Sequence, residues 1–149
     1  RTSRSVVNSP DRVDIWTVFP SRISAATAQM AYEQAGYGPE DMGLIELHDA
    51  FTIEELVYYE ALGLAPEGDG VKLLVEGSTA LTGHIPVNSS GGLISMGHPL
   101  GPTGLGQIAE IVWQMRRVAG PRQIAHEVDV AMAHMIGAGG VCIIHILRK

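Results

Sequence analysis

The segment NSSGGLISMGHPLGPTG, residues 88–104, is the stretch of this 149-residue sequence that decides its fold. It begins as a loop rich in glycine and serine. Pro102 then suits the first turn of a helix, where its missing amide proton costs nothing. The following residues, up to about Ala119, are apolar on nearly every side, which is typical of a buried helix. We therefore expect a loop that is held against the start of a buried helix.

His98 lies in this loop between a glycine and a proline, just before the predicted helix. The amide protons and the positive end of the helix dipole would lie close to its imidazole. This environment favours a neutral imidazole, which can accept a proton from a thiol or donate to a developing oxyanion. The alternative is a tight turn in which His98 only caps the helix or packs, and spacing alone does not separate the two interpretations.

The remaining elements are predicted from hydrophobic periodicity and from the residues that begin and end helices. Thr52 and Glu55 form a candidate capping box for one helix, and Gly36 and Gly63 lie where two helices should end. The resulting order of elements predicts an α/β fold in one domain over residues 1–149. Strands are expected at 13–19, 42–47, 71–75, 128–135 and 141–147, helices at 21–35, 52–62 and 102–119, and a loop at 83–101.

The composition argues against several classes of protein. The formal net charge is −6 and no run of lysine or arginine is visible, so binding to nucleic acid is not expected. No stretch is long and apolar enough to span a bilayer, and the first residues lack the apolar middle of a signal peptide. Cys142 is the only cysteine, which excludes an internal disulfide and fits a reducing cytoplasm.

Two further loops place small or polar residues next to predicted strands. His48-Asp49-Ala50-Phe51 follows a predicted strand directly, and the junction of a strand and a helix is where ligands often bind in α/β sheets. The glycine-rich run 135–140 separates the last two strands, and free backbone amides there could bind a negative oxygen. Each loop also has a purely structural interpretation, the first as a helix start and the second as a hairpin.

Taken in this order, the three loops resemble the C-terminal half of thiolases. The HDAF tetrapeptide, the block NSSGGLISMGHPLGPTG and the final glycine-rich turn carry the resemblance, which runs from about Ser24 to the end. It is greatest toward the branch that includes sterol-carrier-protein-linked and archaeal acetoacetyl-CoA thiolases. It implies a half domain with a mixed sheet and a buried helix, one part of a five-layered α-β-α-β-α fold. The N-terminal half, which normally supplies the acylated cysteine, is expected to be missing from this chain.

The resemblance also implies roles for individual residues. His98 corresponds to the histidine that takes the proton of the nucleophilic cysteine and helps to hold the thioester oxygen in one oxyanion hole. His48 stands where many thiolases have an asparagine that orients a water in the same hole. The backbone amide of Gly137 would line a second oxyanion hole. The residues expected to line the substrate site are Phe51, Met96 and Met135.

Two positions depart from the thiolase pattern. Met135 occupies the place of an acid/base cysteine in biosynthetic thiolases, and Ala50 that of a cysteine in the sterol-carrier-linked branch. Neither side chain can transfer a proton, so we expect His48, or His98 in a second role, to move the proton of the substrate's α-carbon. Cys142 does not replace the missing nucleophile and is predicted to be a small buried residue. Similarly, we expect His134 to be packed or hydrogen-bonded.

The function implied is that of an acyl-CoA C-acyltransferase, acting on 3-oxoacyl-CoA or acetyl-CoA by Claisen or retro-Claisen chemistry. A coenzyme A thioester is then the substrate, without a tightly bound cofactor or a metal. Two alternatives stay open: a thiolase-like lyase that cleaves CoA esters by aldol chemistry, and a non-catalytic partner subunit of the same fold. The resemblance further implies a homo-oligomer, and some relatives associate with a small OB-fold protein.

Overall fold

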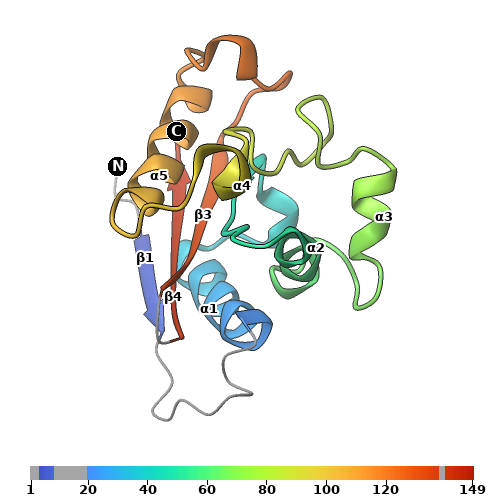
Figure 1. The fold of residues 1–149 in the computed structure, drawn as a ribbon, viewed down its shortest axis with the longest axis vertical. Helices are drawn as coiled ribbons and strands as arrows, with labels where there is room; N and C mark the ends of the chain where they lie inside the picture. The colour runs from blue at the N-terminus through green and yellow to red at the C-terminus, as the bar shows by residue number, and fades with distance from the viewer. Residues whose placement is uncertain (1–3, 9–19, 138–139) are drawn as a thin grey trace.

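The computed structural model describes residues 4–8, 20–137 and 140–149 and contains a four-stranded mixed sheet (Figure 1). β4 (Val141–Arg148) runs antiparallel to both of its neighbours, whereas β2 (Leu44–Glu46) runs parallel to β3 (Val130–Gly137). The strands predicted at 42–47, 128–135 and 141–147 are confirmed, and the one at 13–19 lies outside the described residues. In spatial order, the strands are β1 (Arg4–Asn8), β4, β3 and β2.

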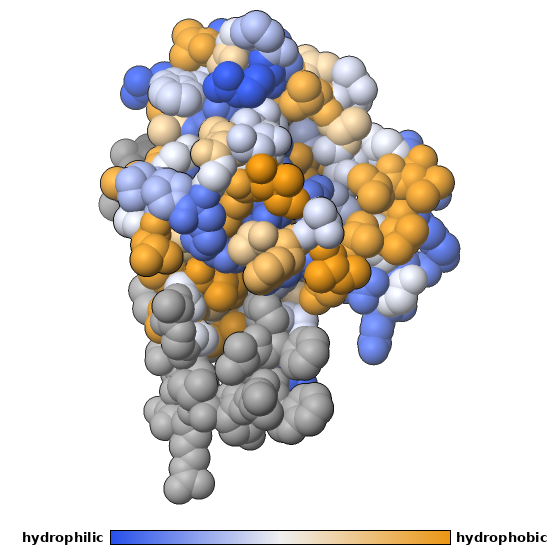
Figure 2. All heavy atoms as spheres, viewed as in Figure 1, coloured by the Kyte–Doolittle hydropathy of each residue, from blue (hydrophilic) through white to orange (hydrophobic). Residues whose placement is uncertain are grey.

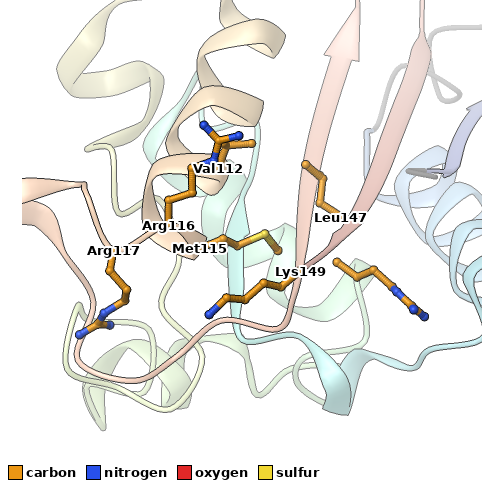
Figure 3. A pocket seen from close by; sticks show the side chains of 7 residues that line it. Val112, Met115, Arg116, Arg117, Leu147 and Lys149 are labelled. Carbon is orange, nitrogen blue, oxygen red and sulfur yellow. The ribbon is translucent and has the colours of Figure 1, made fainter. Parts of the chain in front are cut away.

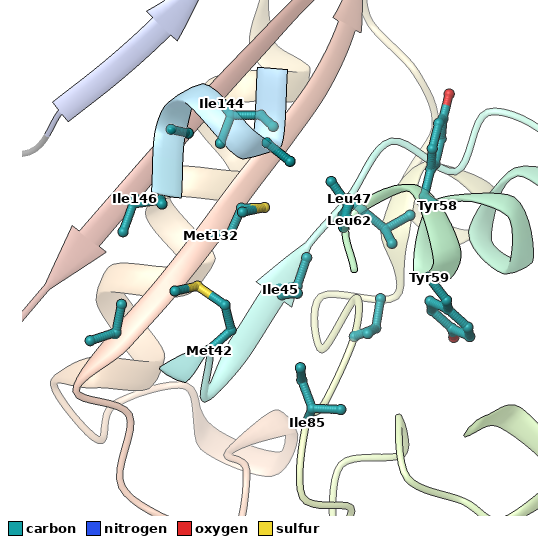
Figure 4. Packing of buried hydrophobic residues seen from close by; sticks show 14 of the residues in the cluster. Met42, Ile45, Leu47, Tyr58, Tyr59, Leu62, Ile85, Met132, Ile144 and Ile146 are labelled. Carbon is teal, nitrogen blue, oxygen red and sulfur yellow. The ribbon is translucent and has the colours of Figure 1, made fainter. Parts of the chain in front are cut away.

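Helices cover both faces of this sheet. α1 (Pro20–Ala35) and α2 (Thr52–Ala61) share one hydrophobic cluster with the sheet, and α5 (Pro102–Met115) belongs to a second cluster. The alternation of side chains along β3 separates the clusters, since Met132 lies in the first and Ala131 in the second. The predicted α/β layering is therefore confirmed. Figure 4 shows the first cluster, in which Ile45, Met132 and Ile144 meet Tyr58, Tyr59 and Leu62.

The strand predicted at 71–75 is wrong, because this segment forms the helix α3 (Gly70–Val75). The Glu60 carboxylate accepts the backbone N–H of Gly70 at 3.0 Å, which fixes the start of α3 against α2. A five-residue apolar run does not distinguish a strand from a helix, and here a tertiary contact decides. α3 exposes Val71, Leu74 and Val75, which form an apolar patch on the surface (Figure 2).

The loop predicted at 83–101 contains a short helix, α4 (Gly92–Met96), and to that extent the prediction is wrong. Gly91 and Gly92 both have positive φ, +96° and +63°, which turns the chain sharply into α4. α2 begins at Thr52, as predicted, but its N-cap differs from the prediction. Phe51 rather than Thr52 is the N-cap, and its backbone N–H donates to the Glu54 carboxylate at 3.1 Å.

α5 is only partly buried, although its sequence predicts burial on nearly every side. Ile111 and Met115 lie in the second cluster, whereas Leu105 is 70% exposed. The helix ends at Met115 rather than near Ala119, because the next turn requires a positive φ of 62° at Arg117. No helix among the described residues has the length and apolar character needed to cross a membrane.

Candidate active site

His48 lies directly beyond the carboxyl end of β2 and is nearly enclosed, with 4% of its surface exposed. Its Nδ1 is 3.1 Å from the Sδ of Met135, which comes from the neighbouring strand β3. A thioether sulfur is only a weak acceptor, so Nδ1 carries the proton and Nε2 keeps a lone pair. Burial, and then the nearby His98, lower the pKa of His48 to about 4. The side chain is therefore a neutral imidazole near pH 7.

His98 lies in the loop between α4 and α5 and is exposed. Its Nδ1 is 3.1 Å from the hydroxyl oxygen of Thr103, and that hydroxyl donates its own proton to the Pro99 carbonyl at 2.7 Å. Because the hydroxyl proton is already used, Thr103 accepts from the Nδ1–H of His98. The neutral imidazole consequently presents the lone pair of Nε2, which can accept a proton.

The two histidine rings meet edge to face, with their centroids 4.8 Å apart and their planes at 81°. They come from loops separated by fifty residues, which the sheet brings together. The segment before α4 runs beside β2, since Val87 forms a parallel bridge with Ile45. Two imidazoles, each with an Nε2 that can accept a proton, therefore lie at one end of the sheet.

Hydrogen bonds attach the loop of His98 to the loop of His48. Asn88, with a φ of +51°, accepts the backbone N–H of Leu47 through Oδ1 at 2.8 Å. Asp49 is buried, and its carboxylate accepts the N–H of Leu93 at 2.7 Å. A Cβ atom at Gly92 would overlap that carboxylate, so only glycine fits beside Asp49. The relative position of the two histidines is thus fixed by local polar contacts.

Glu46, the last residue of β2, is a fully buried carboxyl group beneath this site. Ser89 donates to it at 2.8 Å, and Ser90 donates through both its hydroxyl and its backbone N–H. Burial outweighs these hydrogen bonds and raises the pKa of Glu46 to about 7. A cavity of about 190 Å³ lies between this carboxyl group and the His98 loop, and its lining includes Glu46, Ser90, Leu93, Met96, Thr103 and Gln107.

The other residues predicted for the site lie at different distances from this centre. Met135 contacts His48, as described above, and Gly137 forms the last residue of β3. Met96 is 57% exposed but lines the cavity, whereas Phe51 is 69% exposed at the start of α2. Within the described ranges, no three side chains of histidine, cysteine, aspartate or glutamate are grouped so that they could hold a metal ion.

Cys142 has no exposed surface and lies in the hydrophobic cluster beneath α1. Burial raises the pKa of its thiol, so the reactive thiolate form is disfavoured. The sequence prediction of a small buried residue is confirmed.

A second hollow, of about 410 Å³, lies at the opposite end of the sheet (Figure 3). It brings Arg116, Arg117, Arg148 and Lys149 together, although the sequence shows no run of basic residues. The cationic groups do not converge on one point. Arg117 donates to two backbone carbonyls, Lys149 lies 3.6 Å from Glu127, and Arg116 and Arg117 point away from each other (Figure 3). This hollow does not have the form of a single anion site.

Two polar residues of the site region, Thr103 and Glu46, were not identified from the sequence. Thr103 stands in the first turn of a predicted helix, where nothing in the sequence indicates that its hydroxyl contacts His98. Glu46 could have been noticed as a lone charge within an apolar strand. His134 was predicted to be packed or hydrogen-bonded, which is confirmed, but its contact with the backbone of His48 has no signal in the sequence.

Comparison with known proteins identifies one family, described as thiolase C-terminal domain-like, which the chain matches over residues 8–147. Sterol carrier protein 2 of Rattus norvegicus is 48% identical over 126 residues, which are 85% of this chain and 23% of that protein. Benzoylsuccinyl-CoA thiolase subunit BbsB of Thauera aromatica is 48% identical over 117 residues, 78% of this chain and 30% of the relative. An acetyl-CoA acetyltransferase of Methanothermobacter thermautotrophicus is 42% identical over 142 residues, 93% of this chain and 36% of the relative. The chain thus spans about a third or less of the length of such relatives.

Solved structures share the fold at lower sequence identity. An Ltp2-ChsH2(DUF35) aldolase superposes with a TM-score of 0.74 at 23% identity, over 95% of this chain and 37% of that chain. Human mitochondrial 3-ketoacyl-CoA thiolase gives a TM-score of 0.68, also at 23% identity, over 97% of this chain and 29% of that chain. At this level of identity the likeness concerns the fold alone.

Proposed function

The chain belongs to the family of thiolase C-terminal domains, and from that premise we propose that it carries the histidine half of an acyl-CoA C-acyltransferase. The reaction is the Claisen condensation of two acyl-CoA molecules, or its reverse, the thiolysis of a 3-oxoacyl-CoA. The observation that carries this proposal is the pair of imidazoles, His48 and His98, with ring centroids 4.8 Å apart. Each presents an Nε2 lone pair, as the contacts of Nδ1 with Met135 and Thr103 require.

In this proposal His98 activates the nucleophile. Its Nε2 takes the proton of a cysteine thiol, and the thiolate then attacks the thioester carbonyl and expels the thiolate of coenzyme A. The resulting imidazolium donates its Nε2–H to the oxygen of the next thioester, which is how one histidine serves two steps. Because Cys142 is the only cysteine of this sequence and is enclosed in the core, the nucleophile has to come from outside the 149 residues.

His48 then acts on the α-carbon of the second acyl-CoA. Its Nε2 accepts the α-proton, the carbon–hydrogen electron pair forms an enolate, and the enolate carbon attacks the acyl-cysteine and releases the cysteine thiolate. The lowered pKa of about 4 keeps His48 neutral before this step, so the lone pair of Nε2 is available to accept the proton. Neither step requires a metal or a bound cofactor. The backbone amide of Gly137, at the end of β3, would hold the other thioester oxygen.

The surface around His98 supports coverage by another polypeptide segment. Leu100 and Leu105 are among the most exposed large apolar side chains of the described residues, and they flank the same loop and helix. Large apolar side chains exposed close together in the sequence are typical of an interface. We assign it to an N-terminal thiolase half that supplies the cysteine, with assembly into an oligomer and association with a small OB-fold protein as further parts of the proposal.

Aldol cleavage of a CoA ester is the second candidate, and the replacement of both acid/base cysteines favours it. Met135 and Ala50 occupy those positions and cannot exchange protons. A lyase needs only one base to remove the proton of a β-hydroxyl group, and the two histidines would suffice. The two candidates differ in their products, since thiolysis consumes free coenzyme A and yields two thioesters, whereas aldol cleavage releases a carbonyl compound.

The test uses the intact protein that contains this chain, with acetyl-CoA in deuterated water. We expect His48→Ala to reduce exchange of the α-protons by at least about 100-fold, because general bases contribute factors of this size. Acylation of the cysteine by labelled acetyl-CoA should persist in His48→Ala and should be lost in His98→Ala, which serves as the matched variant. Exchange that is unchanged in His48→Ala would contradict the assigned role, and release of a carbonyl product instead of a second thioester would select the lyase.

A further inference from the structure

His134 is a buried histidine that the proposed chemistry does not use. It belongs to β3, faces the first hydrophobic cluster and has no exposed surface. Its ring lies against Tyr58 of α2, with the ring centroids 4.5 Å apart and the planes at 61°. Its two nitrogens have different partners. Nδ1 lies 3.4 Å from the backbone nitrogen of His48, and Nε2 lies 2.8 Å from the Ser24 hydroxyl of α1.

The location of this contact explains why a side chain is needed. β2 and β3 stop pairing after Glu46 and Ala133, while β3 continues to Gly137. The backbone N–H of His48 therefore faces β3 beyond the last paired residue, whereas that of Leu47 faces the 86–88 segment, as the N–H of Ile45 does. Side chains accept both groups: Asn88 accepts the N–H of Leu47, and His134 accepts the N–H of His48. An unpaired buried N–H would be costly, so both contacts determine the path of the chain.

The partners also determine where the proton of His134 resides. A backbone N–H can only donate, so Nδ1 of His134 must be unprotonated to accept it. The proton of the neutral ring then lies on Nε2 and is donated to the Ser24 hydroxyl. Burial lowers the pKa of His134 to about 3, which keeps this neutral form throughout the physiological range.

We propose that His134 is a positioning residue for the active-site base: through Nδ1 it holds the backbone of His48 and thereby sets the orientation of the His48 ring toward His98. Ser24 of α1 and Tyr58 of α2 hold the His134 ring, so the positions of these two helices determine where the ring meets the backbone of His48. The inference rests on the proposed function, because only that function makes His48 a base that His134 has to position. His134 touches no substrate and transfers no proton.

Two substitutions of similar size separate positioning from simple packing. In His134→Asn, the amide oxygen takes the place of Nδ1 and can still accept from His48, while the bond to Ser24 is lost. In His134→Gln, the amide reaches the place of Nε2 and can still meet Ser24, while the acceptor for His48 is lost. Both variants remove the same ring from the core, so a purely structural role predicts similar losses of activity and of thermal stability.

In the intact protein, we expect His134→Gln to lower kcat for α-proton exchange by about 100-fold with little change in KM, because a base displaced by about 1 Å loses a factor of this order. His134→Asn should stay within about threefold of the wild type, because its acceptor is preserved. Equal kcat values for the two variants, or a drop in KM and kcat together, would overturn the inference.

Nuclear magnetic resonance of ¹⁵N-histidine-labelled intact protein provides a test that does not need turnover. The wild type should show His134 as the neutral Nε2–H form at every pH from about 5 to 8, and the amide proton of His48 should shift in His134→Gln but not in His134→Asn. An Nδ1–H form, or an amide shift of the same size in both variants, would refute the positioning role. A wild type that exchanges no α-protons overturns the proposed function alone, since these spectra still decide the position of His134.

Discussion

Replacing Thr103 by valine should disable His98 without altering the shape of its surroundings. The hydroxyl of Thr103 accepts the Nδ1–H of His98 at 3.1 Å and donates to the Pro99 carbonyl at 2.7 Å. Valine has nearly the volume of threonine but no hydroxyl, so the variant removes both hydrogen bonds and leaves the packing in place. His98 then loses the contact that fixes its tautomer and its ring orientation.

The magnitude follows from the burial of Thr103 and from the charge that His98 acquires. Thr103 is buried, so water does not readily replace its hydroxyl. A hydrogen bond to a charged group contributes about 1.5–3 kcal/mol, and His98 becomes an imidazolium when it takes the thiol proton. Every 1.4 kcal/mol or so of lost transition-state stabilisation lowers the rate tenfold, so we expect kcat to fall by roughly 10- to 100-fold.

The assay is the rate of cysteine acylation by labelled acetyl-CoA in the intact protein, measured in a single turnover. Thr103→Ser is the matched control, since it keeps the hydroxyl and loses only a methyl group, and its rate should stay within about threefold of the wild type. Equal rates for the valine and serine variants would show that the hydroxyl does not support His98. A loss of acylation in both variants with a lowered melting temperature would show that residue 103 acts through packing.

Two further predictions concern buried groups that the chemistry does not use. Burial raises the pKa of Glu46 from 4.5 to about 7 in the folded protein. Between these two pH values the folded protein still binds a proton that the unfolded chain has released, so the free energy of unfolding falls as the pH rises through this window. In urea unfolding, the wild type should lose about 3 kcal/mol relative to Glu46→Gln between pH 4.5 and pH 8, and a constant difference between the two proteins would contradict the raised pKa. Cys142→Ala should retain activity within about twofold, because the thiol has no exposed surface and no role in the proposed chemistry, and a complete loss of acylation in this folded variant would identify Cys142 as the nucleophile after all.

The elements that the sequence predicted correctly have strong local signals. α1 ends where Gly36 adopts a φ of +74°, and β3 and β4 are long apolar runs on either side of a glycine-rich turn. The errors occur where the local signal is weak. The run 71–75 is too short to show a period, and a contact from Glu60, ten residues away, makes it a helix.

Much of the candidate site could be predicted, because its histidines lie in loops with unusual composition. What could not be predicted are the partners that determine their chemistry. Ser24 and His134 are 110 residues apart in the sequence, and Ser89 and Glu46 are 43 residues apart. Spacing within a loop contains no information about such contacts, because only the assembled sheet brings these residues together. The tautomer of His48 and the pKa of Glu46 are therefore properties of the fold rather than of any motif.

The direction of the strands explains why the chemistry gathers at one end of the sheet. β2 and β3 are parallel, so His48 after β2 and Gly137 at the end of β3 lie at the same end of the sheet. Asn88 and Asp49 then attach the loop of His98 to that end, because Asn88 accepts the N–H of Leu47 just after β2 and Asp49 accepts the N–H of Leu93 in α4. In open α/β sheets, ligands bind at the carboxyl ends of the strands, because the chain leaving each strand exposes backbone groups and side chains there. The hollow with the arginines lies at the opposite end of the sheet, where β3 begins and β4 ends, and neither histidine of the site lines it.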